Sequence, residues 1–218
     1  MDVAIVTGAS RGIGRATAIK LSEKFFVVVN YLRNKEKAMQ TVAAIENRSG
    51  EAIMLQGDVS NYEDALRMVK KASEMGNLRV LINNAGIYIV KPLNRMLPSE
   101  WEQIFQVNVF GILNMIRAAI DYMSEGVIVN VSSIIGLYPM ANASAYCASQ
   151  AAVVALTKSL AEEFGSRIKV VCVAPRATDT DMLRKYHPYS FGDPPEKVAN
   201  YILEAVEKGK SGECIIVE

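Results

Sequence analysis

Seven short runs of apolar, mostly β-branched residues recur along the chain, and each has the length of a buried strand. The runs are Val3 to Val6, Phe25 to Val29, Ala52 to Leu55, Val80 to Ile82, Val127 to Val131, Lys169 to Val173 and Cys214 to Val217. Their apolar residues follow one another without alternation, which is typical of strands buried on both faces. The pattern therefore predicts a parallel sheet with helices on both sides.

Longer segments with apolar residues at helical spacing separate these strands. They are Gly12 to Lys24, Lys35 to Arg48, Tyr62 to Met75, Ser99 to Tyr122, Ala145 to Phe164 and Pro195 to Glu207. Regular alternation of strand and helix predicts an α/β protein, a doubly wound Rossmann fold of about seven strands with helices on both faces. We expect residues 1–218 to form one domain, with a surface loop in the Pro- and Gly-containing stretch from His187 to Pro195.

Composition narrows the classes of function. Half of the residues are hydrophobic, 22% are charged, and the net charge is +1, which argues against nucleic acid or a membrane surface as a partner. No apolar run approaches the roughly 20 residues that cross a bilayer, and no export signal is visible at the N-terminus. The three widely separated cysteines fit a cytoplasmic protein, and neither they nor the single His187 has metal-ligand spacing. We interpret His187 as a loop residue.

A glycine-rich turn follows the first predicted strand. It reads Thr7-Gly8-Ala9-Ser10-Arg11-Gly12-Ile13-Gly14 and leads directly into the first predicted helix. Glycines permit a tight turn and close approach of the backbone, and the N-terminal amides of the helix favour a pyrophosphate. A plain strand-to-helix turn is the alternative, but the flanking strand and helix favour a dinucleotide cradle.

This turn and four later motifs resemble the short-chain dehydrogenase/reductase family. The spacing Gly-x-x-x-Gly-x-Gly is followed at family positions by Asn83-Asn84-Ala85-Gly86, Asn108, Ser133 and Tyr146. The resemblance runs from Val3 to about Met182, and within the family it is closest to the 3-oxoacyl carrier-protein reductases. It implies a nicotinamide dinucleotide as cofactor and a carbonyl or alcohol as substrate.

The resemblance also implies which residues contact the cofactor. They are Gly8, Ser10, Arg11, Gly12, Ile13 and Gly14 in the turn, Asp58 and Val59 beside the adenine, Asn84, Ala85 and Gly86, Tyr146 and Gln150, and Pro175, Thr178 and Thr180 near the nicotinamide. For Asp58 alone, a place in a helix N-cap region is an equal alternative. At position 176 the family usually has glycine, whereas this chain has arginine.

Charge at the end of the second strand favours NADP(H) over NAD(H). Enzymes that use NAD usually place an acidic residue there to hold the ribose 2′-hydroxyl, whereas a 2′-phosphate requires cations. No acid occurs from Asn30 to Arg33. We expect Arg11 and Arg33 to face the phosphate, and the alternative for each is a solvated surface charge.

The reaction centre implied by the resemblance contains Tyr146 as proton donor and Ser133 as a ligand of the substrate oxygen, and the spacing makes the neighbouring Ser132 a decoy. A tyrosine with a pKa near 10 needs a cation to become acidic enough, and the family supplies a lysine four residues later. This chain has Gln150 there. Gln150 can bond ribose hydroxyls but carries no charge. Asn108 would hold a water on the proton path, or make an ordinary core hydrogen bond.

Two hypotheses follow. The first is an NADP(H)-dependent oxidoreductase that acts on a 3-oxoacyl thioester or another small ketone or alcohol. The second is an NADP(H)-binding protein with little or no turnover, because Gln150 replaces lysine and Arg176 replaces glycine. By analogy with the family we expect a homodimer or homotetramer and no metal.

Overall fold

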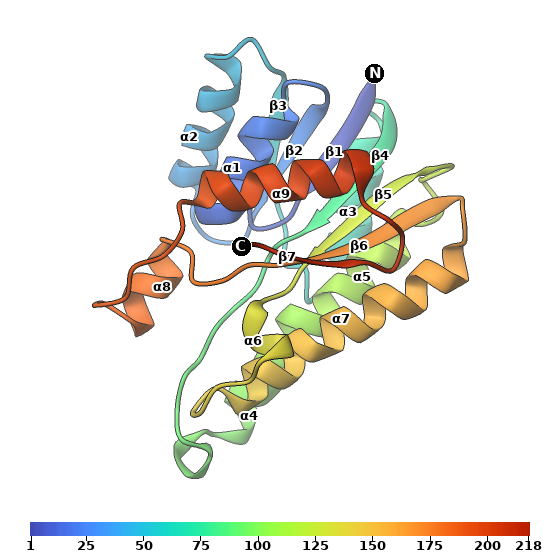
Figure 1. Ribbon diagram of the computed structural model, residues 1–218. Helices are drawn as coiled ribbons and strands as arrows, with labels where there is room; N and C mark the ends of the chain where they lie inside the picture. Colours follow the sequence, from blue (N-terminus) through green and yellow to red (C-terminus); the bar gives the residue numbers. More distant parts are fainter.

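The computed structural model describes all 218 residues and contains one seven-stranded, wholly parallel sheet, as the strand pattern predicts (Figure 1). The strand order is β3-β2-β1-β4-β5-β6-β7. The strands are β1 (Asp2–Val6), β2 (Phe26–Tyr31), β3 (Ala52–Gln56), β4 (Asn77–Asn83), β5 (Gly126–Val131), β6 (Ile168–Ala174) and β7 (Cys214–Ile216). The Rossmann fold expected from the sequence is confirmed.

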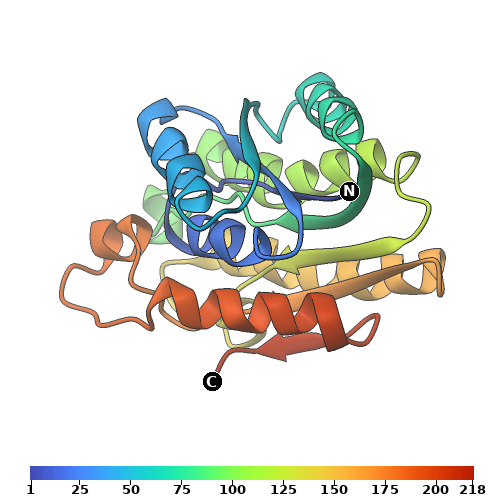
Figure 2. The ribbon, with the colours of Figure 1, turned by 90° about the horizontal axis from the view of Figure 1, so that it is seen from above.

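Helices cover both faces of the sheet, which gives three layers (Figure 2). They are α1 (Gly12–Leu21), α2 (Lys35–Glu46), α3 (Tyr62–Ser73), α4 (Pro98–Phe105), α5 (Gly111–Ala119), α6 (Ile134–Leu137), α7 (Ser144–Phe164), α8 (Asp181–Tyr186) and α9 (Pro195–Lys208). Buried residues of α1, α2 and α9 pack on one face, and those of α3, α5 and α7 on the other. No helix is long and apolar enough to span a membrane.

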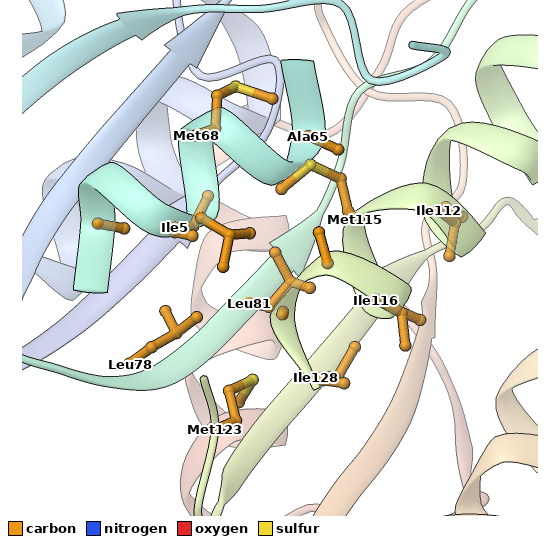
Figure 3. Packing of buried hydrophobic residues seen from close by; sticks show 14 of the residues in the cluster. Ile5, Ala65, Met68, Leu78, Leu81, Ile112, Met115, Ile116, Met123 and Ile128 are labelled. Carbon is orange, nitrogen blue, oxygen red and sulfur yellow. The ribbon is translucent and has the colours of Figure 1, made fainter. Parts of the chain in front are cut away.

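The core on the α3–α5–α7 side is built from large, fully buried side chains. Figure 3 shows Leu81 of β4 and Met115 of α5 among them. Leu81 and Met115 have no exposed surface, and Ile128 of β5 is buried beside them. Successive residues of each strand point to opposite faces of the sheet. The core under α3, α5 and α7 and the core under α1 and α9 are therefore separate clusters.

Replacing Leu81 by alanine is expected to lower the free energy of unfolding by about 2–5 kcal/mol, because it leaves a cavity in a fully buried site. Urea denaturation followed by circular dichroism measures the change. Leu93, which is 60% exposed, provides the matched control: its alanine variant should unfold within about 0.5 kcal/mol of the natural protein. Equal losses at both positions would contradict this assignment of the core.

The point where the order of winding reverses lies between β1 and β4. The chain runs outward from β1 through β2 to β3, then returns to β4 on the other side of β1 and continues outward. In open α/β sheets such a reversal opens a crevice at the carboxyl ends of the strands, where ligands bind. The glycine-rich turn follows β1 and the Asn84-Ala85-Gly86 segment follows β4, so both border this crevice.

The single helix predicted from Ser99 to Tyr122 is wrong. The structure has α4, a π-helical turn from Gln106 to Phe110, and then α5, which ends at Ala119. Gly111 begins α5 against Val59, and a Cβ on Gly111 would lie 2.7 Å from a methyl carbon of Val59. The wider turn places Asn108 inside the protein, and π-turns of this kind are frequent at functional sites.

Other differences are local. The short helices α6 and α8 were not expected. The predicted ends of α1, α2 and α3 overrun by two or three residues, because turns continue beyond each helix. All three cysteines are free, although Cys172 of β6 and Cys214 of β7 lie in register despite their distance in sequence.

Candidate functional site

The glycine-rich turn has the backbone that a cradle requires. Gly8 and Gly12 have φ angles of 63° and 55°, a region that favours glycine. A Cβ on Gly14 would lie 2.5 Å from both the side-chain amide nitrogen of Asn84 and the Gly8 carbonyl oxygen. Side chains at these positions would therefore distort the turn.

Hydrogen bonds fix this turn to the segment after β4. The Thr7 hydroxyl accepts from the backbone amides of Asn84 (2.9 Å) and Ala85 (3.0 Å) and donates to the Ile82 carbonyl at 3.2 Å. The Asn84 side chain donates to the Thr7 carbonyl at 2.8 Å. On the other side, the Asn30 side chain accepts from the Gly8 amide at 3.1 Å. The two walls of the crevice are thus held in one rigid arrangement.

The side of the crevice beyond β2 carries basic residues. Arg11 is the N-cap of α1 and is exposed, and Arg33 is exposed in the loop after β2 without an ion pair. Lys37, in the first turn of α2, was not singled out in the sequence. Its ammonium lies 2.8 Å from the carboxylate of Asp181, which also lies 3.9 Å from Arg11. Its position in the helix after β2 was the signal that could have identified it.

Asp58 and Val59 follow β3 at the same edge of the sheet. The Asp58 carboxylate accepts from the backbone amide (2.9 Å) and the hydroxyl (2.6 Å) of Ser60. The N-cap of α3 is Asn61, whose side chain accepts from the Asp64 amide. Asp58 is therefore not the cap itself, although it belongs to the turn that precedes the helix. Val59 is buried against α5.

Tyr146 and Ser133 face each other at the carboxyl end of β5. Ser133 is the N-cap of α6, and its side chain interacts with Tyr146 of α7. Burial raises the pKa of Tyr146 well above its usual range, the nearby Tyr88 raises it further, and the neighbouring Ser133 hydroxyl lowers it. Ser132, in contrast, is buried and donates to the backbone carbonyl of Gln150 at 2.9 Å. Ser132 is therefore a structural residue, and Ser133 is the one beside Tyr146.

Gln150 lies one turn after Tyr146 on α7, with only 4% of its surface exposed. Its side-chain oxygen has no hydrogen-bond partner. A Cβ on Gly136 of α6 would lie 2.8 Å from the Gln150 backbone and Cβ, so α6 packs closely on this residue. No basic side chain contributes to the pKa of Tyr146. A buried amide oxygen without a partner normally finds one in a ligand or water.

Asn108 makes several hydrogen bonds within the protein. Its side chain accepts from the Ile87 amide at 2.8 Å and donates to the Ile87 carbonyl at 3.0 Å. It also donates to Ser149 at 3.2 Å, and Ser149 donates to the Tyr146 carbonyl at 2.7 Å. Asn108 thereby links the segment after β4 to α7. This is the core hydrogen-bonding alternative, and a role in holding water remains a prediction.

Tyr146 is covered by an aromatic group centred on Tyr88, a residue that the sequence did not single out. The ring of Tyr88 lies edge-on to that of Tyr146, with 4.5 Å between centroids, and to that of Tyr186, with 5.2 Å. The Tyr88 hydroxyl is 3.0 Å from Nε2 of His187. His187, interpreted above as a loop residue, thus joins the site from the end of α8. Aromatic residues far apart in sequence gave no signal of this contact.

The segment after β6 leads from the sheet into α8. Pro175 is buried, and Arg176 is exposed without an ion pair. Thr178 donates to the Arg176 carbonyl at 3.0 Å. Thr180 caps α8 by accepting from the Leu183 amide at 3.3 Å. A Cβ on Gly12 would lie 3.1 Å from the methyl carbon of Thr180, so this segment lies directly over the glycine-rich turn.

The residues present fit a nicotinamide dinucleotide. The turn between β1 and α1 has left-handed glycines and backbone amides where a pyrophosphate would bind. The unpartnered oxygen belongs to Gln150, one helical turn after the candidate proton donor Tyr146, and a ribose hydroxyl could donate to it. Arg11, Arg33 and Lys37 lie at the other end of the crevice, where the 2′ position of an adenosine is recognised in this fold.

Comparison with known proteins agrees with this geometry. The family model described as short chain dehydrogenase matches residues 2–189. A 3-oxoacyl-(acyl-carrier-protein) reductase of Staphylococcus aureus is 40% identical over 185 residues, which are 82% of this chain and 75% of that protein. A 3beta-hydroxysteroid dehydrogenase 1 of Eggerthella lenta is 38% identical over 203 residues, 89% of this chain and 76% of that protein.

Solved structures show the same fold over nearly the whole chain. A dehydrogenase/reductase from Sinorhizobium meliloti superposes with a TM-score of 0.91 at 31% identity, covering 99% of this chain and 93% of that one. A short chain dehydrogenase from Burkholderia cenocepacia, solved in complex with NADP, gives a TM-score of 0.90 at 31% identity, covering 99% and 95%.

Proposed function

Because the chain belongs to the short-chain dehydrogenase family, we propose that it is an NADP(H)-dependent oxidoreductase that interconverts a carbonyl and an alcohol. The observation that carries this proposal is the pair Tyr146 and Ser133, held beside the glycine-rich cradle at the carboxyl ends of β1, β4 and β5. A proton donor and a polar ligand for one oxygen are what carbonyl reduction requires of a protein.

Bound NADP(H) would supply the hydride for reduction, or accept it in the reverse direction. The protein's part begins with the Ser133 hydroxyl, which bonds the substrate oxygen and holds it near Tyr146. As negative charge develops on that oxygen, the Tyr146 hydroxyl donates its proton to it. The high pKa of Tyr146 keeps this proton in place at neutral pH. In the oxidation direction, the same pKa leaves little Tyr146 phenolate available as a base at neutral pH.

Gln150 would position the cofactor by a hydrogen bond with a ribose hydroxyl. Its oxygen is buried and unpartnered, so it can accept such a bond without breaking another. It does not stabilise the Tyr146 phenolate as an ammonium would. We therefore expect a slow enzyme that favours reduction at neutral pH.

For the substrate we propose a 3-oxoacyl thioester or another small ketone. Support comes from the staphylococcal relative, named as a 3-oxoacyl-(acyl-carrier-protein) reductase, and from two exposed cations near the site. Arg176 lies on the segment after β6 and Lys185 on α8. These cations suit an anionic carrier. Tyr88 and Tyr186 give the inner part of the site an apolar lining.

The test is the rate of NADPH oxidation by the purified protein with acetoacetyl thioesters, ketones and aldehydes, after binding of NADPH has been measured by fluorescence. We expect binding, and turnover that is fastest with an acetoacetyl thioester. Turnover only with simple ketones would support the proposed oxidoreductase activity and contradict the thioester as its substrate. Absence of binding would contradict the proposed function as a whole.

The second candidate is an NADP(H)-binding protein with little turnover. It is favoured by one observation, namely that no cation offsets the effect of burial on the pKa of Tyr146. Binding of NADPH without turnover on any carbonyl would support this candidate. Measurable reduction that depends on Tyr146 would exclude it.

Arg11 is expected to determine the preference for the phosphorylated cofactor. A hydrogen bond to a charged group contributes about 1.5–3 kcal/mol, so Arg11→Ala should weaken NADPH binding about tenfold or more. NADH, which lacks the 2′-phosphate, should be affected less than threefold, and titration calorimetry measures both. Arg33 is exposed and forms no ion pair. The same measurement on Arg33→Ala shows whether Arg33 contacts the 2′-phosphate or is a solvated surface charge. An equal loss for both cofactors in Arg11→Ala would contradict this role.

A further inference from the structure

Asp181 occupies an unusual place for a carboxylate in a site proposed to bind a phosphate. It is the first residue of α8, and it lies 2.8 Å from the ammonium of Lys37 and 3.9 Å from the guanidinium of Arg11. These two cations come from different elements, the first turn of α2 and the N-cap of α1. A single carboxylate thus contacts both cations.

We propose that Asp181 is an internal competitor of the cofactor 2′-phosphate, and that NADP(H) displaces it from Lys37 and Arg11 and so releases α8. This inference rests on the proposed function and assigns a specificity-determining role to a residue outside the reaction centre. NAD(H) has no 2′-phosphate and leaves the carboxylate in place. The same residue would therefore distinguish the cofactors and report their identity to α8.

The position of the cations supports this competition. In Rossmann proteins the residues that follow the second strand and those of the glycine-rich turn recognise the 2′ position. Lys37 and Arg11 occupy these two places, and the end of β2 itself carries no acid. Lys37, Arg184 and Arg11 hold the pKa of Asp181 below its usual range. The Asp181 carboxyl is therefore ionised at neutral pH. Two anions cannot share this pair of cations without repulsion.

Contacts of α8 explain why displacement of Asp181 would reach beyond one ion pair. Arg184 forms ion pairs with both Asp179 and Asp181, which ties the first turn of α8 together. Thr180, immediately before Asp181, lies against Gly12 and caps the helix. The other end of α8 places Tyr186 against Tyr88, which covers Tyr146. In Figure 1, α8 lies apart from the sheet on the side of α2.

The first experiment compares cofactor affinities in Asp181→Asn. Asparagine is nearly isosteric but cannot pair with the cations, which remain free for the phosphate. Since exposed ion pairs are individually weak, we expect NADPH to bind about threefold to tenfold more tightly relative to NADH. Glu36→Gln is the matched control, because Glu36 is an exposed carboxylate next to Lys37 that forms no ion pair. Its ratio of affinities should change less than twofold.

An unchanged ratio in Asp181→Asn, with tight NADPH binding by the natural protein, would overturn the inference and leave the proposed function intact. An equal gain in Glu36→Gln would also overturn it, because the effect would then be one of general charge. Failure of the natural protein to bind NADPH would remove the proposed function and the inference together.

The second experiment reads the release of α8 directly. Trypsin cleaves after Arg184 and Lys185, both exposed within α8. Saturating 2′,5′-ADP, which carries the phosphate but no nicotinamide, should accelerate cleavage there several-fold, whereas 5′-AMP should not. Asp181→Asn should be cleaved fast from the start and respond to neither nucleotide. Equal rates with the two nucleotides in the natural protein would contradict the release.

Discussion

Replacing Tyr146 by phenylalanine is expected to lower the rate of carbonyl reduction by about 10²–10⁴-fold, the usual contribution of a positioned general acid. The ring of Tyr146 packs edge-on against Tyr88, and phenylalanine keeps this contact. The affinity for NADPH should change little, because only one hydroxyl is lost. Steady-state kinetics and fluorescence titration measure the two quantities on the same preparation.

The matched control for this substitution is Tyr88→Phe. It also removes one hydroxyl from the same aromatic group, in this case the one bonded to His187. Because Tyr88 is not expected to transfer a proton to the substrate, its variant should keep its rate within about tenfold, the loss of one ordinary hydrogen bond. Retention of the full rate by Tyr146→Phe would show that another group donates the proton.

Replacing Gln150 by lysine is expected to accelerate turnover. An ammonium within about 4–6 Å lowers the pKa of an acid by about 1–3 units, so the proton of Tyr146 becomes easier to donate. We expect a rate increase on the order of 10- to 100-fold at neutral pH. Gln150→Met, which has similar length but neither charge nor hydrogen-bonding amide, separates the effect of charge from that of cofactor positioning.

The pH dependence of the same variants gives an independent measurement. Reduction needs the protonated Tyr146, and burial raises its pKa, so the natural protein should reduce its substrate at a constant rate from neutral to alkaline pH. Oxidation needs the phenolate and should keep rising with pH over that range. In Gln150→Lys the rise should occur at lower pH. Identical oxidation profiles for glutamine and lysine would show that residue 150 does not act on Tyr146.

The sequence predicts those features that depend on short-range pattern. Continuous apolar runs indicated all seven strands. The inner strands are mostly buried, whereas the edge strands β3 and β7 are only partly buried. The glycine-rich turn was recognisable because Gly8 and Gly12 need left-handed backbone that other residues rarely adopt. The π-turn around Asn108 was missed, because helical periodicity is similar for a continuous helix and for one with a widened turn.

Contacts between distant segments were beyond sequence reasoning. Lys37 and Asp181 are 144 residues apart, and only the folded chain brings the first turn of α8 to the first turn of α2. The group formed by Tyr88, Tyr186 and His187 depends likewise on the path of the segment after β6. Spacing alone favoured Ser133 over Ser132, but it did not indicate that the Ser132 hydroxyl donates to the backbone carbonyl of Gln150.

The bond between Ser132 and the backbone carbonyl of residue 150 separates two tasks that a single side chain would otherwise combine. The carbonyl attaches α7 to the end of β5, whatever side chain the residue carries. Evolution can therefore exchange the chemistry of position 150 while the neighbouring tyrosine keeps its place. Protein engineering has the same freedom. A charged side chain can be introduced or removed at position 150 to change the reaction rate, while the backbone around the site stays the same.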